Sequence, residues 1–185
     1  IPLLNKQKSV LEINCGTGFD ALTIAKQVKS VLATDISEEM VRVSKKKNSS
    51  EKVNFLAADI NSLHQHLDDK YDLLLSNFGG LNCLVTEELK QFSKNISPYI
   101  HSHGHLALVI MGKKCLWENL FFYKQNDKRL YRRDTNEGVE TTINGIRFKT
   151  YYYSPEQIQQ IFSNEFERIM VKPIGLFIPP SYLNA

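Results

Sequence analysis

The sequence predicts an α/β domain in which helices cover both faces of a parallel β-sheet. Between residues 9 and 111, short apolar runs alternate with stretches of helical spacing, as in strands joined by right-handed helical crossovers. The run at 71–76 is almost uniformly apolar, as expected of a strand buried on both faces. Acidic or amide residues end or follow several runs, where open parallel sheets bind ligands.

The first half of the chain is expected to hold five strands and three main helices. The strands are expected at 9–14, 31–34, 53–57, 71–76 and 105–111. The helices are expected at 19–28, 38–47 and 86–99. Ser37 is suited to cap the second helix, since Glu38 and Glu39 follow it in the first turn, where acidic side chains are favourable.

A turn at Gly104 is expected to lead into the fifth strand. His101, His103 and His105 alternate around this glycine. We interpret them as a solvated turn at the end of the sheet opposite the ligand, and not as a metal site.

The pattern changes after residue 112. A helix is expected at 113–124 and a polar irregular stretch at 125–137. The segments 139–143 and 146–152 flank Asn144-Gly145, a strong hairpin signal. Ser154, with Pro155 and Gln157 after it, predicts a capped helix. A sixth strand is expected at 166–171.

We expect one domain over residues 1–185. Its core would be 9–112, the hairpin region 113–153 would be an elaboration, and 154–185 would supply a C-terminal helix and strand. Prolines at 173, 179 and 180 leave no room for another strand, since proline is excluded from central strands. We therefore expect a piece of a longer chain, without the final strand and without helices upstream of Ile1.

Composition excludes several classes of protein. The chain has 185 residues, 42% of them hydrophobic, with 23 basic and 20 acidic residues, as in an ordinary globular domain. A net charge of +3 does not favour nucleic acid as a partner. No apolar run approaches the roughly 18 residues of a membrane span. Cys15, Cys83 and Cys115 are too dispersed for a zinc site or a disulfide framework, so we expect a cytoplasmic protein without a metal.

The most informative segment is the glycine turn after the first strand. Gly16-Thr-Gly-Phe-Asp-Ala21 fits the pattern G-x-G-x-x-A, and Asp35 lies about 20 residues further on, as a ribose-binding acid does in dinucleotide folds. Glycines let the backbone approach a ligand closely. This pattern alone fits both NAD and S-adenosylmethionine (SAM).

Three features favour SAM. Glu12 precedes the turn, where it would attract an ammonium or sulfonium group and repel a pyrophosphate. Asp59 follows the third strand, in a position to accept from an adenine amine. The chain also has no Tyr-x-x-x-Lys pair of the kind that short-chain dehydrogenases use.

Four segments together resemble the class I SAM-dependent methyltransferases, with the Rossmann-like sheet of that family. They are Leu11-Glu-Ile-Asn-Cys-Gly-Thr-Gly18, Ala33-Thr-Asp-Ile-Ser37, Leu56-Ala-Ala-Asp-Ile60 and Tyr71-Asp-Leu-Leu-Leu-Ser-Asn-Phe78. Asn14 replaces the first of the three glycines usual in the family, and asparagine tolerates unusual backbone angles. The stretch 78–84 is similar to a subset that acts on small molecules.

The resemblance implies a set of cofactor-binding residues. Glu12, Cys15, Gly16 and Gly18 would line the methionine and sulfonium side. Asp35 would hold the ribose, and Ile36 and Met40 would pack near the adenine. Asp59 and Ile60 would bind the adenine edge, and Asn77 would lie near the transferred methyl group as the candidate catalytic residue.

The leading hypothesis is a methyltransferase that carries the methyl group of SAM to a small-molecule acceptor. Positioning would supply most of the acceleration, and a base would be needed only if the acceptor must lose a proton. Asn77, Tyr151 and Glu118 are the first residues to mutate. The alternatives are an NAD-dependent oxidoreductase, a methyltransferase acting on RNA or protein, and a binding domain that keeps the fold without turnover.

Overall fold

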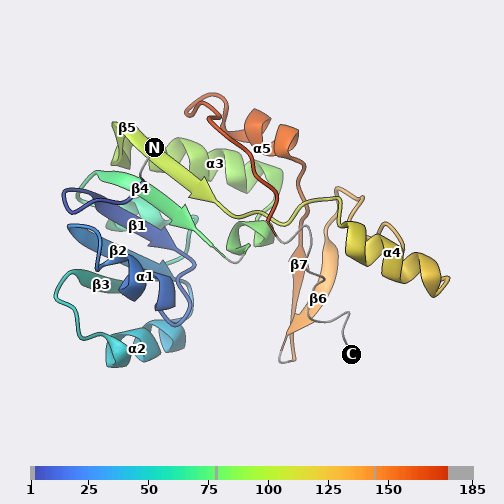
Figure 1. Ribbon diagram of the computed structural model, residues 1–185, viewed down its shortest axis with the longest axis horizontal. Helices are drawn as coiled ribbons and strands as arrows, with labels where there is room; N and C mark the ends of the chain where they lie inside the picture. Colours follow the sequence, from blue (N-terminus) through green and yellow to red (C-terminus); the bar gives the residue numbers. More distant parts are fainter. Residues whose placement is uncertain (1–2, 78, 144, 175–185) are drawn as a thin grey trace. The chain divides into compact units, whose positions relative to one another are not determined.

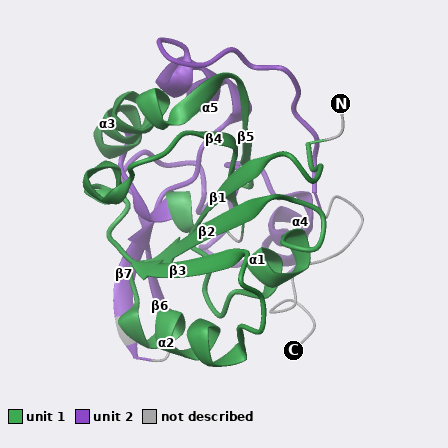
Figure 2. Ribbon diagram, turned by 90° about the vertical axis from the view of Figure 1, so that its left-hand side faces the viewer, with its two compact units in different colours: residues 1–81, 87–110 green, residues 82–86, 111–185 purple. Residues whose placement is uncertain are grey.

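The computed structural model describes residues 3–77, 79–143 and 145–174. They fall into two compact units, coloured separately in Figure 2. Unit 1 comprises Ile1–Leu81 and Glu87–Ile110, and unit 2 comprises Asn82–Thr86 and Met111–Ala185. In the described part of the chain, no helix is long and apolar enough to cross a membrane.

Unit 1 is built on a parallel sheet of five strands (Figure 1). In sequence order the strands are β1 Ser9–Ile13, β2 Ser30–Asp35, β3 Val53–Ala57, β4 Tyr71–Ser76 and β5 Ile100–Leu108. In space their order is β3-β2-β1-β4-β5, so the direction of winding reverses between β1 and β4. Ligands bind at such a reversal, beyond the carboxyl ends of the strands. The predicted fold class is confirmed.

Helices α1 Phe19–Ile24 and α2 Glu38–Lys47 cover one face of the sheet, and α3 Thr86–Ile96 covers the other (Figures 1 and 2). Short 3-10 turns stand at η1 Leu63–His66, η2 Gly80–Cys83 and η3 Ser97–Tyr99. Ser37 caps α2, as predicted, by accepting the Met40 N–H at 3.3 Å. Helix α1 ends four residues before the predicted position, because the Lys29 N–H bonds to the Lys8 carbonyl and draws the chain back to the sheet.

Alternate side chains of the strands pack against different helices, since successive residues of a strand point to opposite faces. Val10 and Phe55 belong to the cluster that includes Ala21 of α1 and Val41 of α2. On the opposite face, β1 buries Leu11 and Ile13, and α3 contributes three buried residues: Leu89, Phe92 and Ile96.

The start of β5 differs from the prediction. The strand begins at Ile100 and not at 105, so His101 and His103 lie on the strand, with exposed side chains, and Gly104 is inside it. The register against β4 shifts between the pairs Tyr71↔Ile100 and Leu73↔His105, which marks a bulge. A Cβ on Gly104 would lie 2.6 Å from Ile100 Cγ2 and 2.9 Å from the His101 carbonyl oxygen. The glycine therefore permits this bulge and does not end a turn.

Unit 2 contains two helices and a two-stranded hairpin. The elements are α4 Leu116–Lys124, β6 Val139–Ile143, β7 Ile146–Thr150 and α5 Pro155–Phe162. The predicted hairpin is confirmed, with Val139 opposite Thr150, although Asn144 lies outside the described residues. The predicted capping box is also confirmed: Ser154 Oγ accepts the Gln157 N–H, and Gln157 Oε1 accepts the Ser154 N–H.

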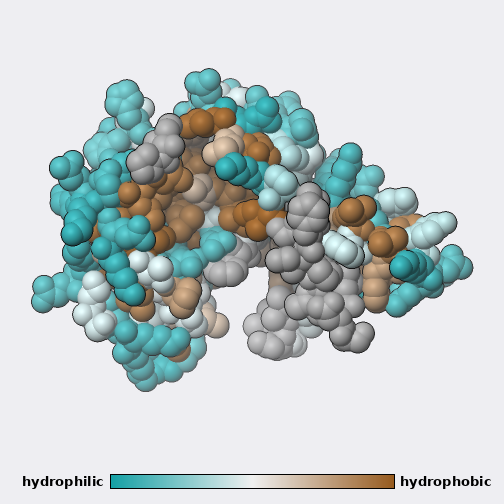
Figure 3. Space-filling model, in the orientation of Figure 1, coloured by the Kyte–Doolittle hydropathy of each residue, from teal (hydrophilic) through white to brown (hydrophobic). Residues whose placement is uncertain are grey.

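One side of helix α4 is apolar and exposed, and another side is buried. Leu116, Leu120 and Tyr123, at i, i+4 and i+7, are exposed, and hydrophobic side chains reach the surface there in Figure 3. Glu118 and Phe122 are buried. Arg129 lies 4.6 Å from the centre of the Phe122 ring, so the next turn of the chain covers the buried side.

The predicted sixth strand at 166–171 is wrong. No strand forms among the described residues after α5, and Ile169, Met170 and Val171 are exposed. The Phe166 N–H bonds to the Phe162 carbonyl, and the two rings lie 6.3 Å apart. These contacts hold the start of the segment against the last turn of α5. Apolar and β-branched residues favour a strand only where another strand pairs with them.

The tight packing of Gly104 gives a test of the bulge. We expect Gly104→Ala to lower the free energy of unfolding by about 1–3 kcal/mol, because the added methyl group meets backbone and side-chain atoms that must move. Gly112→Ala is the matched control, since the nearest atom there is 3.8 Å away. Urea unfolding of both variants measures the difference, and equal stabilities would contradict a packed bulge.

Candidate cofactor site

Polar side chains gather at the carboxyl ends of four neighbouring strands of unit 1. Glu12 lies near the end of β1, Asp35 ends β2, Asp59 follows β3 and Asn77 follows β4. Because β3, β2, β1 and β4 are adjacent in that order, these residues share one edge of the sheet. That edge includes the reversal between β1 and β4, so the topology brings the predicted site residues together.

The glycine turn between β1 and α1 uses left-handed backbone angles. Asn14, Gly16 and Gly18 have φ values of 58°, 53° and 75°. Asn14 thus adopts the angle that the family's glycine would supply. The turn is fixed by the Cys15 N–H bonding to the Thr34 carbonyl and the Gly18 N–H bonding to the Cys15 carbonyl, both at 2.9 Å.

The two glycines of the turn have different functions. No atom lies within 4 Å of the place where a Cβ on Gly16 would stand, so this side of the backbone is open to a ligand. A Cβ on Gly18 would lie 2.6 Å from Phe55 Cε1 and 3.1 Å from Ser44 Cβ. Gly18 therefore allows the turn to pack on β3 and α2, a structural reason that the sequence pattern did not distinguish from ligand approach.

Asp35 links the glycine turn to α2. Its Oδ2 accepts the Gly16 N–H at 2.8 Å, and its Oδ1 accepts the Ser37 N–H at 2.9 Å. A carboxylate accepts about four hydrogen bonds, so capacity remains for the two hydroxyls of a ribose. Ser44 supports the same turn, because its Oγ donates to the Gly16 carbonyl at 3.0 Å.

Glu12 is a buried acid with an unpaired oxygen. Its side chain is 2% exposed, and its Oε2 has no hydrogen-bond partner among the described residues. Burial, with the nearby negative charge of Asp20, raises the pKa of Glu12 to about 8, although the Ala21 N–H partly opposes the rise. A buried acid with a raised pKa and an oxygen without a partner is a candidate functional-site residue.

Asp20 and Asn77 extend this polar group. The Asn77 amide nitrogen donates to Asp20 Oδ2 at 2.7 Å, which connects α1 to the segment after β4. Asp20 was not predicted as a site residue. Its position two residues after Gly18, in the first turn of α1, is the signal that identifies it.

Asn14 also connects the turn to the segment after β4. Its amide nitrogen lies 3.4 Å from Ser76 Oγ, and a Cβ on Gly80 would overlap its side chain. The asparagine that departs from the family pattern therefore fits against a glycine. Phe78, which closes the fourth motif, lies outside the described residues.

The other predicted residues lie in the turn, just after β2 and β3, or in the first turn of α2. Ile36 and Met40 are 70% and 41% exposed, and this exposed apolar surface suits contact with the adenine ring of a ligand. Asp59 is exposed, with Oδ1 accepting the Asn61 N–H at 2.9 Å, and Ile60 is half-buried. Burial and the charges of Glu12 and Asp35 raise the pKa of Cys15 to about 12, so its thiol stays protonated and is no nucleophile.

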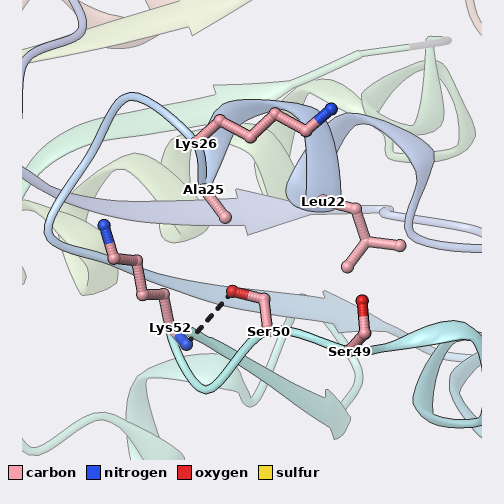
Figure 4. A pocket seen from close by; sticks show the side chains of 6 residues that line it. All are labelled: Leu22, Ala25, Lys26, Ser49, Ser50 and Lys52. Carbon is pink, nitrogen blue, oxygen red and sulfur yellow. Dashed lines mark hydrogen bonds between the residues drawn. The ribbon is translucent and has the colours of Figure 1, made fainter.

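A separate hollow of about 320 Å³ lies between α1 and the loop before β3 (Figure 4). Its lining is Leu22, Ala25, Lys26, Ser49, Ser50 and Lys52. It stands at the amino end of β3 and contains none of the predicted site residues. Lys52 Nζ donates to the Val28 carbonyl at 3.2 Å, so this hydrogen bond links the residue to the chain before β2. No group of three metal-binding side chains exists among the described residues.

The buried acid predicts how stability depends on pH. A glutamate with a raised pKa binds its proton more strongly when folded, so its protonated form stabilises the protein and this stability is lost as pH rises from about 4.5 towards 8. We expect Glu12→Gln to raise the free energy of unfolding at pH 7 by about 2–3 kcal/mol. The gain should vanish near pH 4.5. Thermal unfolding across this range tests it, with Glu51→Gln on the exposed loop before β3 as control, and a gain that did not change with pH would oppose it.

Comparison with known proteins places the chain in a family. A family model described as "Methyltransferase domain" matches residues 10–104, just over half of the chain. The chain is 26% identical to a malonyl-[acyl-carrier protein] O-methyltransferase of Bacillus anthracis over 85% of its own length and 54% of that protein. It is 40% identical to a ribosomal protein L11 methyltransferase of Lactobacillus gasseri over 55% of its length and 30% of that protein.

Solved structures share the fold. A structure described as "DhpI-SAM-HEP complex" matches with a TM-score of 0.64 at 18% identity, over 84% of this chain and 68% of that one. The chain spans between a third and about half of the length of the first curated relatives that it matches. The family match covers β1 to the first half of β5, with the glycine turn and all four polar strand ends, and the chain therefore belongs to the family of methyltransferase domains.

Proposed function

We propose that this chain binds SAM at the carboxyl edge of its sheet and transfers the methyl group to a small-molecule acceptor. The observation that carries the proposal is the buried Glu12 oxygen without a partner, next to Asp20 and the glycine turn. An unpaired buried acid is costly and is compensated by a cation. SAM has an ammonium and a sulfonium, which would stabilise the carboxylate of Glu12, whereas a dinucleotide would bring a pyrophosphate that the charge of Asp20 repels.

The residues present fit the other parts of SAM. Gly16 leaves open space beside the backbone, and Asp35 has acceptor capacity for the ribose. Ile36 and Met40 supply exposed apolar surface for the adenine, and Asp59 and Ile60 stand at the end of the next strand for its edge. Cys15 and Gly18 shape the turn. The structure described as "DhpI-SAM-HEP complex" has the same fold.

When bound, SAM supplies a methyl group activated by the positive sulfur. The protein's task is to hold the donor, exclude water and position an acceptor in line, and such positioning supplies a large share of the acceleration. Asn77 remains the candidate next to the transferred group. Because its amide nitrogen donates to Asp20, Asn77 also fixes the acid and the strand end relative to each other.

A general base is harder to assign. Glu118 is disfavoured, because both of its oxygens accept from Arg132 and Arg133 at 2.8–3.1 Å and its side chain is 1% exposed. Two adjacent guanidinium groups stabilise the carboxylate and weaken it as a base. Tyr151 remains a candidate, with its ring packed against Gly138.

A carrier-bound or protein acceptor is the second candidate. Relatives are named for malonyl-[acyl-carrier protein] and for ribosomal protein L11. Residues 111–185 hold 11 basic and 8 acidic residues, whereas residues 1–110 hold 12 of each. All of the net positive charge thus lies in residues 111–185, which include the elaboration 113–153 with its 9 basic and 5 acidic residues. This charge suits an acidic acceptor or carrier. Labelled methyl transfer from SAM to free acids and to carrier-bound acids distinguishes the two.

Donor binding gives the direct test. We expect calorimetry to detect SAM binding and no comparable binding of NAD. Asp35→Ala should weaken SAM binding about 10- to 100-fold, because it removes charged acceptors of hydrogen bonds worth roughly 1.5–3 kcal/mol. Asp68→Ala, an exposed acid before β4 at the opposite edge, should bind as the wild type does. NAD binding without SAM binding would end the proposal, and unfolding curves show whether Asp35→Ala is folded.

A further inference from the structure

We infer that Glu12 holds a proton in the unliganded protein and releases it when the cationic methyl donor binds, so that donor binding is coupled to proton release. This inference rests on the proposed function, since it takes the donor to be SAM. It goes further by assigning Glu12 a change of ionisation state: the residue loses its proton when the bound ligand carries a positive charge and keeps it when the ligand does not.

The geometry of Glu12 favours the neutral acid when no ligand is present. The side chain is 2% exposed, and Oε2 has no partner among the described residues. A carboxylate without a partner at such a depth has a large desolvation cost. A protonated carboxyl group carries no charge and avoids most of this cost.

The neighbouring groups oppose ionisation as well. Asp20 of α1 places a negative charge nearby, and Cys15 of the turn stays protonated as a thiol. The paired positions on the adjacent strands are Ala33 and Leu75, which do not titrate. Among the described residues, the Ala21 N–H is the one group that favours the charged form, and no positive side chain among them stabilises a carboxylate there.

A cation at the site reverses this balance. The pKa of Glu12 stands at about 8 because of burial and Asp20, so the unliganded acid is mostly protonated at pH 7. An opposite charge within a few ångströms lowers the pKa of a carboxyl group by about 1–3 units. The ammonium or sulfonium of SAM therefore draws the proton off, and a ligand without a cation leaves it in place.

The coupling fixes the sign of the pH dependence. Below the pKa of the free protein, donor affinity should rise with pH by up to about tenfold per unit, because at each higher pH less work is needed to remove the proton. The range from pH 5.5 to 7 is suitable, since the α-amino group of the donor, with a pKa of about 7.7–8.0, stays protonated throughout.

The experiment is calorimetric titration of the whole chain with SAM at pH 7, in buffers of different ionisation enthalpy, which counts protons exchanged. We expect about 0.4 to 0.9 of a proton released for the wild type and for Glu51→Gln, as a lowering of the pKa by 1–3 units from about 8 requires at pH 7, and none for Glu12→Gln. 5′-Methylthioadenosine keeps the adenosine and the thioether but has neither cation, and we expect it to bind without proton release. Dissociation constants from pH 5.5 to 7 should fall with pH for the wild type and stay flat for Glu12→Gln.

The outcomes separate this inference from the proposed function. If SAM binds with no proton release and with pH-independent affinity, the inference is wrong and the proposed function stands. Equal proton release by wild type and Glu12→Gln would assign the proton to another group and would also overturn the inference. If the wild type binds no SAM at any pH, the proposed function itself fails. If Glu12→Gln unfolds, proton counting on the wild type with the two ligands still decides.

Discussion

The carboxylate of Asp35 accepts one backbone N–H from the glycine turn and another from the start of α2, at 2.8 and 2.9 Å. These two bonds fix the positions of Gly16 and Ser37. Because Ser37 caps α2, they also position the start of that helix. Ser44 of that helix then donates to the Gly16 carbonyl. The helix, the turn and the strand end thus restrain one another around a single acid. Because the same acid has acceptor capacity left, the two bonds hold it in position for the ribose contact of the proposed function.

Glu12 shows the cost of such a site. A residue at this depth on β1 would ordinarily be apolar, as its neighbours Leu11 and Ile13 are, and the acid lowers the stability of the unliganded protein at neutral pH. The adjacent Asp20 increases that cost, and Asn77 holds Asp20 in place. Instability of this kind is common where a ligand supplies the missing partner. Under the proposed function, fold stability and donor binding would therefore depend on Glu12 in opposite directions.

Most of unit 1 could be predicted because β1 to β4 are short, largely apolar runs and α2 has the Ser37 cap that its sequence predicts. The predictions were wrong where contacts between distant residues determine the local structure. Gly104 suggested a turn but permits a bulge against Tyr71 and Ile100, and 166–171 has strand-forming residues but no partner strand. In the site, the pattern of the turn identified Gly16 and Gly18 together, yet only packing on Phe55 separates their functions. The bond between Asn77 and Asp20 joins residues far apart in the sequence, and no local pattern encodes it.

Buried polar networks join the irregular segments of unit 2. Asn82, fully buried, bonds through its side chain to the N–H and carbonyl of Met111 and to the carbonyl of Tyr151, and the Tyr153 hydroxyl bonds to the Leu84 carbonyl. Glu118 binds Arg132 and Arg133 with both oxygens, and Arg133 stacks on Tyr152. Buried amide and ion-pair networks specify one arrangement of irregular segments more than they add stability. The segments 82–86 and 111–153 are in this way joined into one body. Under the proposed function, this body could vary with the acceptor while the donor residues of unit 1 stay the same.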